Sequence, residues 1–259
     1  MAKVTIIGAT GQVGSYVAHA VSQFPHVQEM CLYGRPGNEQ YLDGLAHDMM
    51  DSFAARGTNT RVTFGTTPKE LRGSDIIVLT SGIPRKATQT RLDLALENAR
   101  IVKGYAEQIG RMAPEAILLV VTNPVDIMTT VGGIQIDNLM GVAKLPREEM
   151  IQRVKSSGSY IIQAKGATVY GPGDAIATLV RTIVEDENRM LTVSTQIRRE
   201  VFGHEGVCVS VPARITRGGV FPIGVKLSEE EEKMFAKSVK LIRDTTENVC
   251  AVLDSESQE

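Results

Sequence analysis

The chain has 259 residues, a formal net charge of -2 and a pI of about 6.1, and apolar residues make up 42% of it. This length is enough for one or two domains with a sizeable core. The sequence has no basic block and no apolar run of membrane-spanning length, which argues against nucleic acid or a membrane as partner. Cys31, Cys208 and Cys250 are scattered, so we expect no disulfide framework, no metal site and a cytoplasmic location.

The first half of the chain alternates short apolar runs with helical patterns. Strands are expected over 3–7, 28–33, 61–65, 74–80 and 116–122, and helices over 14–21, 41–53 and 92–111. Such alternation is typical of a parallel sheet that helices cover on both faces. This half is therefore predicted to be a Rossmann-type, doubly wound α/β domain, with a ligand crevice at the carboxyl ends of its strands.

The second half has a different pattern, which indicates a smaller α+β domain. Helices are expected over 147–165, 174–185 and 229–253, and strands over 191–195, 207–215 and 220–227. Gly171-Pro172-Gly173 predicts a break between helices, and Arg217-Gly218-Gly219 predicts a hairpin turn. The last residues, 254–259, should fray. The pattern breaks near 130–133, so we predict two domains, 1–130 and 131–259.

A glycine-punctuated turn joins the first strand to the first helix. It consists of Gly8, Ala9, Thr10, Gly11, Gln12, Val13 and Gly14. Gly8 is expected to make the tight turn, Gly11 to let N–H groups reach phosphates, and Gly14 to let the helix pack on its strand. A strand, such a turn and a helix N-terminus together predict a dinucleotide site, with a turn that binds no ligand as the alternative.

The second strand ends in Leu32-Tyr33-Gly34-Arg35. Folds that bind NAD usually place an acidic residue near this point, where it accepts a hydrogen bond from the ribose 2′-hydroxyl. Here no carboxylate follows the strand, and Arg35 supplies a guanidinium suited to a 2′-phosphate. Gly34 and Arg35 thus predict a preference for NADP(H), with NAD(H) still possible; the alternative is that Arg35 is a solvated loop residue.

Polar groups also follow the fourth and fifth predicted strands. Arg85, Lys86 and Arg91 stand in one loop, which predicts a lid over an anionic substrate, with a solvated charged loop as the alternative. Asn123, before Pro124 at the end of the fifth strand, can bind a ligand through its amide or simply start a turn.

Together these residues resemble the lactate/malate dehydrogenase family, and its archaeal malate dehydrogenases in particular. The similar stretches, in the family's order, are 6–14, 80–86, 91–94, 97–101, 121–126, 158–166, 191–194 and 207–212. The resemblance implies hydride transfer between NADP(H) and malate or oxaloacetate, within the tricarboxylic acid cycle, by a homodimer or homotetramer.

The resemblance also implies roles for individual residues. Arg85 would select a dicarboxylate, Arg91 would polarise the keto oxygen of the substrate, and Asn123 would contact both substrate and cofactor. Asn98, Val121 and Thr122 would be further cofactor contacts.

One block of the family pattern is missing. A histidine that moves the proton, and an Asp-x-x-Arg motif that orients it and clamps the substrate carboxylate, belong after the Asn-Pro strand end. Here Thr130 runs directly into Val131-Gly132-Gly133, so roughly 50–60 residues are absent. Their loss should expose a sheet edge and apolar helix faces.

No other part of the chain replaces this block, so no catalytic residue is identified. The histidines are His19, His26, His47 and His204. Gly203-His204-Glu205-Gly206 imitates the catalytic run in the wrong order, and Asp186-Glu187-Asn188-Arg189, which spells the second motif, is interpreted as a solvated cluster.

Three explanations fit the gap: a sequence that lacks part of the natural chain, a real deletion that still folds, or a partner subunit that completes the site. The first two are favoured, because no residue supports a histidine supplied in trans. The alternative function is a non-catalytic NADP(H)-binding protein. A short-chain dehydrogenase/reductase is disfavoured, since it needs a Tyr-x-x-x-Lys pair and Tyr160 and Lys165 are five residues apart.

Overall fold

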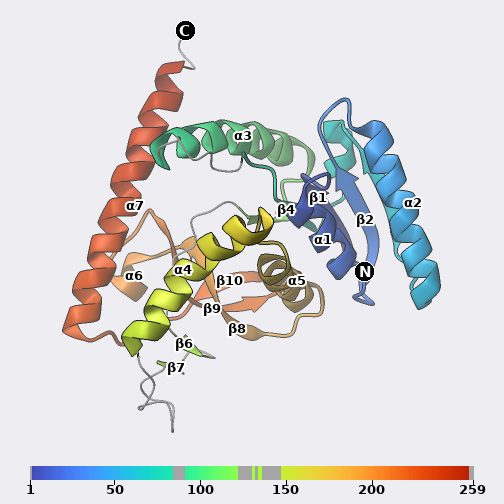
Figure 1. The fold of residues 1–259 in the computed structure, drawn as a ribbon. Coiled ribbons are helices and arrows are strands. Elements are labelled where there is room, and N and C mark those ends of the chain that lie inside the picture. Colours follow the sequence, from blue (N-terminus) through green and yellow to red (C-terminus); the bar gives the residue numbers. More distant parts are fainter. Residues whose placement is uncertain (1, 84–90, 122–129, 132–133, 136–146, 257–259) are drawn as a thin grey trace.

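The computed structural model describes residues 2–83, 91–121, 130–131, 134–135 and 147–256 (Figure 1). Its first half contains a five-stranded parallel sheet in the order β3-β2-β1-β4-β5. The strands are β1 (Ala2–Ile7), β2 (Val27–Tyr33), β3 (Arg61–Gly65), β4 (Ile76–Leu79) and β5 (Ile117–Val120). The predicted doubly wound α/β sheet is confirmed.

Helices cover both faces of this sheet. They are α1 (Gln12–Val21), α2 (Glu39–Arg56), the short 3-10 helix η1 (Pro68–Leu71) and α3 (Arg91–Met112). Val4 and Ile6 of β1 belong to a core cluster with side chains of α1 and α2, whereas Ile7 belongs to a second cluster under α3 and η1. Side chains of a strand alternate between faces, so a sheet covered twice needs the continuous apolar runs that the sequence has.

The second half adds a small antiparallel sheet, ordered β10-β9-β8, and four helices of the described chain. The elements are the hairpin β6 (Thr130–Val131) and β7 (Ile134–Gln135), then α4 (Arg147–Lys165), α5 (Tyr170–Val184), β8 (Arg189–Gln196), α6 (Arg199–Phe202), β9 (Cys208–Thr216), β10 (Gly219–Pro222) and α7 (Glu229–Glu256). Thr216 pairs with Gly219, which confirms the predicted hairpin turn. The last strand is shorter than predicted and ends at Pro222.

The two halves share one core. Ile176 and Val180 of α5 lie in the same buried cluster as Val4 and Ile6 of β1. The cluster arises because α5 packs along α1, and Gly173 allows this approach: a Cβ there would lie 2.3 Å from a ring carbon of Tyr16. The division at residues 130/131 stays a prediction.

Two boundary predictions are wrong. Residues 171–173 do not interrupt a helix, because α5 begins at Tyr170 and Pro172 lies in its first turn, where a missing N–H costs nothing. The fraying predicted from residue 254 onward is wrong for 254–256, because α7 continues to Glu256, whose carboxylate pairs with Arg100. The predicted open edge is consistent with β5, the outermost strand of the described sheet, where Val120 is 48% exposed.

A substitution at Gly14 tests whether α1 packs closely on the glycine turn. A Cβ on Gly14 would lie 2.3 Å from the carbonyl oxygen of Gly8, which is backbone and cannot swing away. Gly14→Ala is therefore expected to lower the free energy of unfolding by about 1–3 kcal/mol, measured by urea denaturation.

Gly44, in the middle of α2, is the matched control, because a Cβ there meets nothing within 4 Å. Gly44→Ala should stabilise the protein by up to about 1 kcal/mol through helix propensity alone. Equal effects of the two substitutions would contradict the packing described for Gly14.

Candidate cofactor site

The carboxyl ends of β1, β2, β3 and β4 surround a hollow of about 550 Å³. Residues that follow these strands line one side of it: Gly8, Thr10, Gly11, Gly34, Arg35, Pro36, Thr66, Pro68, Thr80, Ser81 and Gly82. Helix α3 supplies the opposing residues Arg100, Ile101, Gly104, Tyr105 and Gln108. The hollow therefore lies where open parallel sheets bind their ligands.

The glycine turn at the base of the hollow has the geometry of an anion site. Gly8 has φ +89°, a left-handed conformation that favours glycine, and a Cβ there would come within 3 Å of Thr80 and Ser81. Gly11 caps α1 without a side-chain hydrogen bond, and no acidic residue stands in the first turn. The first N–H groups of a helix have no partner within it, so this end can bind phosphate oxygens.

The end of β2 carries a cation and no carboxylate. Gly34 is buried, and a Cβ there would lie 2.9 Å from Leu42 Cδ1, so a side chain at this position would have to displace the end of a fully buried leucine. Arg35 is exposed, and its guanidinium makes no ion pair within the part of the chain that the structure describes. It is free to bind an anionic ligand.

Glu39 is the carboxylate beside this end of the hollow, although it does not line it. Its Oε1 accepts a hydrogen bond from the Thr66 hydroxyl at 2.8 Å, and its Oε2 accepts one from the Gly37 N–H at 2.9 Å. The bond from Thr66, then a bond from the backbone N–H of Glu39 itself, and last that from Gly37, hold the pKa of Glu39 below its ordinary value. The carboxylate is thus committed to the turn after β2.

An aromatic wall closes the hollow on the side of α3. The hydroxyl of Tyr33 donates to Gln108 Oε1 at 3.1 Å, and the ring of Tyr33 meets the edge of Tyr105 with centroids 6.1 Å apart. Burial raises the pKa of Tyr33, so it remains a neutral donor. Flat aromatic and apolar surfaces of this kind suit a planar heterocycle.

The residues of this wall and Arg100 are not among the predicted site residues. Their signal is helical spacing, since 101, 105 and 108 lie one turn apart and so share one face of α3. The alternation in β2 also turns Tyr33 toward the side of the sheet that α3 covers.

Several predicted site residues place no side chain in this hollow, so any contact that they make with a cofactor is through their backbone. Ala9 and Val13 pack in the core, Gly14 packs against Gly8, and Gln12 lines a different hollow. Asn98 Oδ1 accepts a hydrogen bond from the N–H of Ile83 at 2.8 Å, and so holds the chain that follows β4.

Val121 and the predicted substrate residues remain without a structural test. Val121 continues the ladder of β5, since its N–H donates to the Leu79 carbonyl at 2.9 Å. Thr122, Asn123 and Arg85, with Lys86, lie outside the described residues. Arg91 begins α3, and the position of its side chain is not described. The roles of these residues stay predictions.

Family models match both halves of the chain. The model described as lactate/malate dehydrogenase, NAD binding domain, matches residues 2–135, and the alpha/beta C-terminal domain of the same family matches residues 124–253. The chain belongs to the lactate/malate dehydrogenase family.

Individual relatives agree with this assignment. Malate dehydrogenase of Methanothermobacter thermautotrophicus is 33% identical over an alignment that covers 98% of this chain and 99% of that protein. L-2-hydroxycarboxylate dehydrogenase (NAD(P)(+)) of Methanocaldococcus jannaschii is 31% identical, with 95% of this chain and 99% of that protein covered. The structure of Archaeoglobus fulgidus malate dehydrogenase in complex with NADH matches with a TM-score of 0.84 and 29% identity, over 95% of this chain and 99% of that one.

The chain is shorter than its family relatives by an internal block. The alignment with the Methanothermobacter thermautotrophicus enzyme spans 321 positions, whereas this chain has 259 residues, so at least 62 aligned positions have no counterpart here. The two family models overlap at 124–135, around the point where the sequence places the gap. Both observations support a missing block near Thr130.

None of the four histidines lines the cofactor hollow. His204 lies beside Phe235, with ring centroids 6.0 Å apart, and His26 and His47 stand near the acidic residues Glu185 and Asp43. Within the described residues, no group of three or more His, Cys, Asp or Glu side chains could hold a metal ion. In the same residues, no helix is both long and apolar enough to span a membrane.

Residues 186–189, predicted to be a solvated cluster, have Asp186 and Asn188 exposed, whereas Glu187 is partly buried. These residues form a built turn between α5 and β8, in which Asp186 and Asn188 adopt left-handed conformations with φ 51° and 53°. Glu187 is partly buried and accepts hydrogen bonds from Arg181 Nε at 2.9 Å and from Arg189 at 3.3 Å. Glu187 thus pairs with Arg181 and Arg189, whereas Asp186 accepts a hydrogen bond from the N–H of Arg217.

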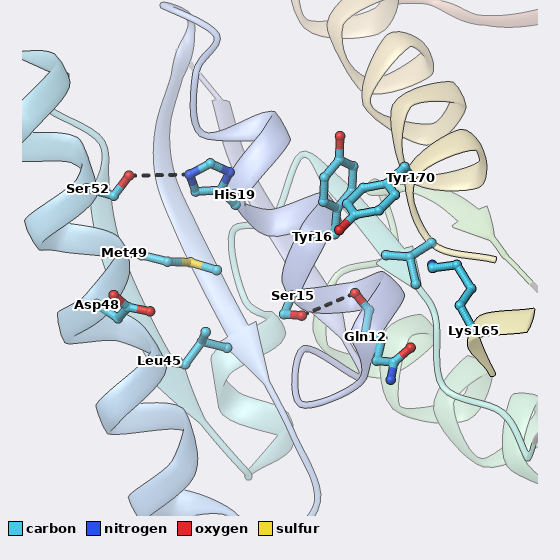
Figure 2. Close-up of a pocket in the computed structure, with 11 residues that line it drawn as sticks. Gln12, Ser15, Tyr16, His19, Leu45, Asp48, Met49, Ser52, Lys165 and Tyr170 are labelled. Atoms are coloured by element: carbon cyan, nitrogen blue, oxygen red, sulfur yellow. Dashed lines mark hydrogen bonds between the residues drawn. The ribbon is translucent and has the colours of Figure 1, made fainter. Parts of the chain in front are cut away.

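A second hollow, of about 610 Å³, lies between α1, α2 and the start of α5. Figure 2 shows the ring of His19 turned toward Ser52 and the ring of Tyr16 against Tyr170. His19 Nε2 lies 3.3 Å from the Ser52 hydroxyl and 3.1 Å from a guanidinium nitrogen of Arg56. Since a guanidinium only donates, Nε2 is the acceptor and the ring is neutral. His19 is therefore a structural link between α1 and α2.

This link predicts a dependence of stability on pH. Burial, and then the charge of Arg56, lower the pKa of His19 below its ordinary value of 6.5, so the unfolded chain takes up the proton more readily. The free energy of unfolding should therefore fall as the pH drops below about 6.5. His19→Gln, which keeps an acceptor for Arg56, should weaken this dependence in melting curves taken between about pH 7.5 and pH 5.5.

His47→Gln, at an exposed position of α2, is the control for that experiment. If the free energy of unfolding of both variants falls toward low pH as steeply as that of the wild type, the contact between His19 and Arg56 does not cause the pH dependence.

Proposed function

We propose that this family member binds NADP(H) in the hollow beside Arg35 and that its reaction is hydride transfer between NADP(H) and malate or oxaloacetate. The observation that carries the cofactor choice is the end of β2, where Arg35 is unpaired in the described chain and a glycine, Gly34, packs closely against Leu42 in place of an acidic residue. The names of relatives support both dinucleotides, because one carries NAD(P)(+) in its name and another was solved with NADH.

The residues of the hollow fit such a cofactor. The free N–H groups at the start of α1 would hold the diphosphate, the aromatic wall of Tyr33 and Tyr105 would face the adenine, and Arg35 would bind the 2′-phosphate. Among the described residues that line the hollow, none carries a carboxylate that would repel these phosphates. The bound cofactor supplies or accepts the hydride.

The substrate half of the site rests on the family assignment. Arg85, Arg91 and Asn123 are proposed to bind a small dicarboxylate, as their positions in the motifs imply. None of the histidines, the residues that most often donate a proton to a developing alkoxide, lines the hollow. This favours slow turnover, or a protein that binds NADP(H) without catalysis, as the second candidate function.

A ligand-induced shift in melting temperature tests the cofactor proposal. A ligand that binds only the folded protein stabilises it by about 2.7 kcal/mol at a concentration 100 times its Kd. NADPH should therefore raise the melting temperature more than NADH at equal concentration. No shift with either dinucleotide would contradict the proposed function, and a larger shift with NADH would contradict the choice of cofactor.

We also propose that the protein is a homodimer, with a second copy seated over the second hollow. Tyr41, Leu45, Asp48 and Ser52 follow one another at helical spacing along α2, and the last three line that hollow. Tyr41 is 56% exposed, and across the hollow Tyr170 is 63% exposed, so the face keeps large apolar side chains in solvent.

Tyr41→Glu should shift a dimer toward the monomer mass of 28.1 kDa in light scattering, because it places a charge in the contact. Met234→Glu, at a 65% exposed position of α7, is the control. A wild type of monomer mass would contradict the proposed dimer.

A cytoplasmic location remains part of the proposal, supported by the free thiols of Cys31, Cys208 and Cys250.

A further inference from the structure

The cofactor hollow has two charged side chains among its described lining residues, Arg35 and Arg100. Their surroundings differ. Arg35 makes no ion pair in the described chain, whereas the guanidinium of Arg100, on α3, forms an ion pair with the carboxylate of Glu256. One guanidinium of the hollow is thus available to an anion and the other is occupied.

Glu256 reaches Arg100 from the far end of the sequence. Figure 1 shows the carboxyl-terminal part of α7 beside α3, and the two helices are in contact. Arg100 Nε donates to Glu256 Oε2 at 2.9 Å, and a second guanidinium nitrogen donates to Oε1. This is the two-bond geometry with which arginine also binds phosphate groups, so a carboxylate and a phosphate are direct competitors for it.

The pair can open without disturbing the fold. The side chains of Arg100 and Glu256 are 46% and 44% exposed, and an ion pair in solvent contributes little to stability. Arg100 stands one residue before Ile101 and four before Gly104, both of which line the hollow. Once Glu256 releases it, the side chain of Arg100 is long and flexible enough to turn its guanidinium toward a ligand in the hollow.

We propose that Glu256 competes with the phosphate groups of a bound dinucleotide for Arg100, so that the end of the C-terminal helix sets how tightly the hollow holds its cofactor. The proposal rests on the proposed function, because it assigns a residue that tunes affinity to the same site. Two other charged residues of α3, Glu97 and Lys103, also act on this pair. The test must therefore show that an effect of Glu256 passes through Arg100.

The experiment is a fluorescence titration of NADPH into the 259-residue protein at low ionic strength. The Glu256→Gln variant should bind NADPH about two- to fivefold more tightly than the wild type. The effect is small because the ion pair that it removes, between Arg100 and Glu256, is exposed to solvent and therefore weak. In the double variant Arg100→Gln/Glu256→Gln, the second substitution should add nothing to the Kd of Arg100→Gln alone. Glu247→Gln, an exposed glutamate of α7 without an ion pair among the described residues, controls for the loss of one negative charge.

An unchanged or weaker NADPH affinity in Glu256→Gln would overturn the proposal. So would equal tightening in the Arg100→Gln background or in Glu247→Gln, since either result means a general charge effect. A wild type that binds no NADPH contradicts the proposed function instead. A wild type that binds NADPH, with no response to Glu256→Gln, contradicts this inference alone.

Discussion

With oxaloacetate and NADPH, the wild-type protein is expected to turn over roughly 10²–10⁴-fold more slowly than a full-length archaeal relative assayed beside it. Hydride transfer to a ketone leaves an alkoxide, and a positioned proton donor stabilises that charge as it forms. The cofactor hollow has no histidine, and at least 62 aligned positions of the relative have no counterpart in this chain. The measurement is the fall in NADPH absorbance, with pyruvate as the control substrate.

Added imidazole makes this prediction more specific. If the missing group is the proton donor, imidazole in solution can partly replace it, so the slow rate should rise with imidazole concentration near neutral pH. A protein that only binds the cofactor would show no turnover with or without imidazole. Turnover as fast as that of the relative, in a chain whose intact mass confirms 259 residues, would contradict the view that the missing block is needed for catalysis.

Arg35→Ala is expected to weaken NADPH binding by about 10–100-fold, because a hydrogen bond to a charged group contributes about 1.5–3 kcal/mol. NADH has no 2′-phosphate, so its affinity should change little. Residues 34–38, which follow β2, contain no second cation that could replace Arg35. Isothermal titration of both dinucleotides against wild type and variant measures the two effects together.

Arg111→Ala is the matched control, because Arg111 lies at the far end of α3 and does not line the hollow. Arg35→Asp goes further, since a carboxylate there repels a 2′-phosphate and can accept a hydrogen bond from a 2′-hydroxyl. It should reverse the preference toward NADH. If Arg35→Ala weakens the binding of NADPH and of NADH equally, Arg35 does not bind the 2′-phosphate.

The parts of the fold that the sequence predicted are those built from local pattern. Apolar runs and helical spacing indicated all five strands of the parallel sheet, and the Arg217-Gly218 turn indicated the β9–β10 hairpin. The packing role predicted for Gly14 is confirmed, since a Cβ there would overlap the Gly8 carbonyl. Each of these features depends on residues close together in the chain.

The features that the sequence missed depend on contacts between distant residues. Arg100 and Glu256 are 156 positions apart, and Tyr33 and Gln108 are 75 apart, so neither pair has a local signal. Pro172 predicts a break, but α5 begins before it at Tyr170, because the first turn of a helix tolerates proline. The turn at 186–189 likewise depends on Arg181, in the helix before it.

The Kd of the wild-type protein for NADPH, measured beside that for NADH by fluorescence titration in one buffer, decides whether the hollow beside Arg35 prefers the dinucleotide with a 2′-phosphate. If the hollow beside Arg35 is a dinucleotide site that accepts an extra phosphate, NADPH binds tighter by about 10-fold or more. Tighter binding of NADH, or no binding of either, would contradict it.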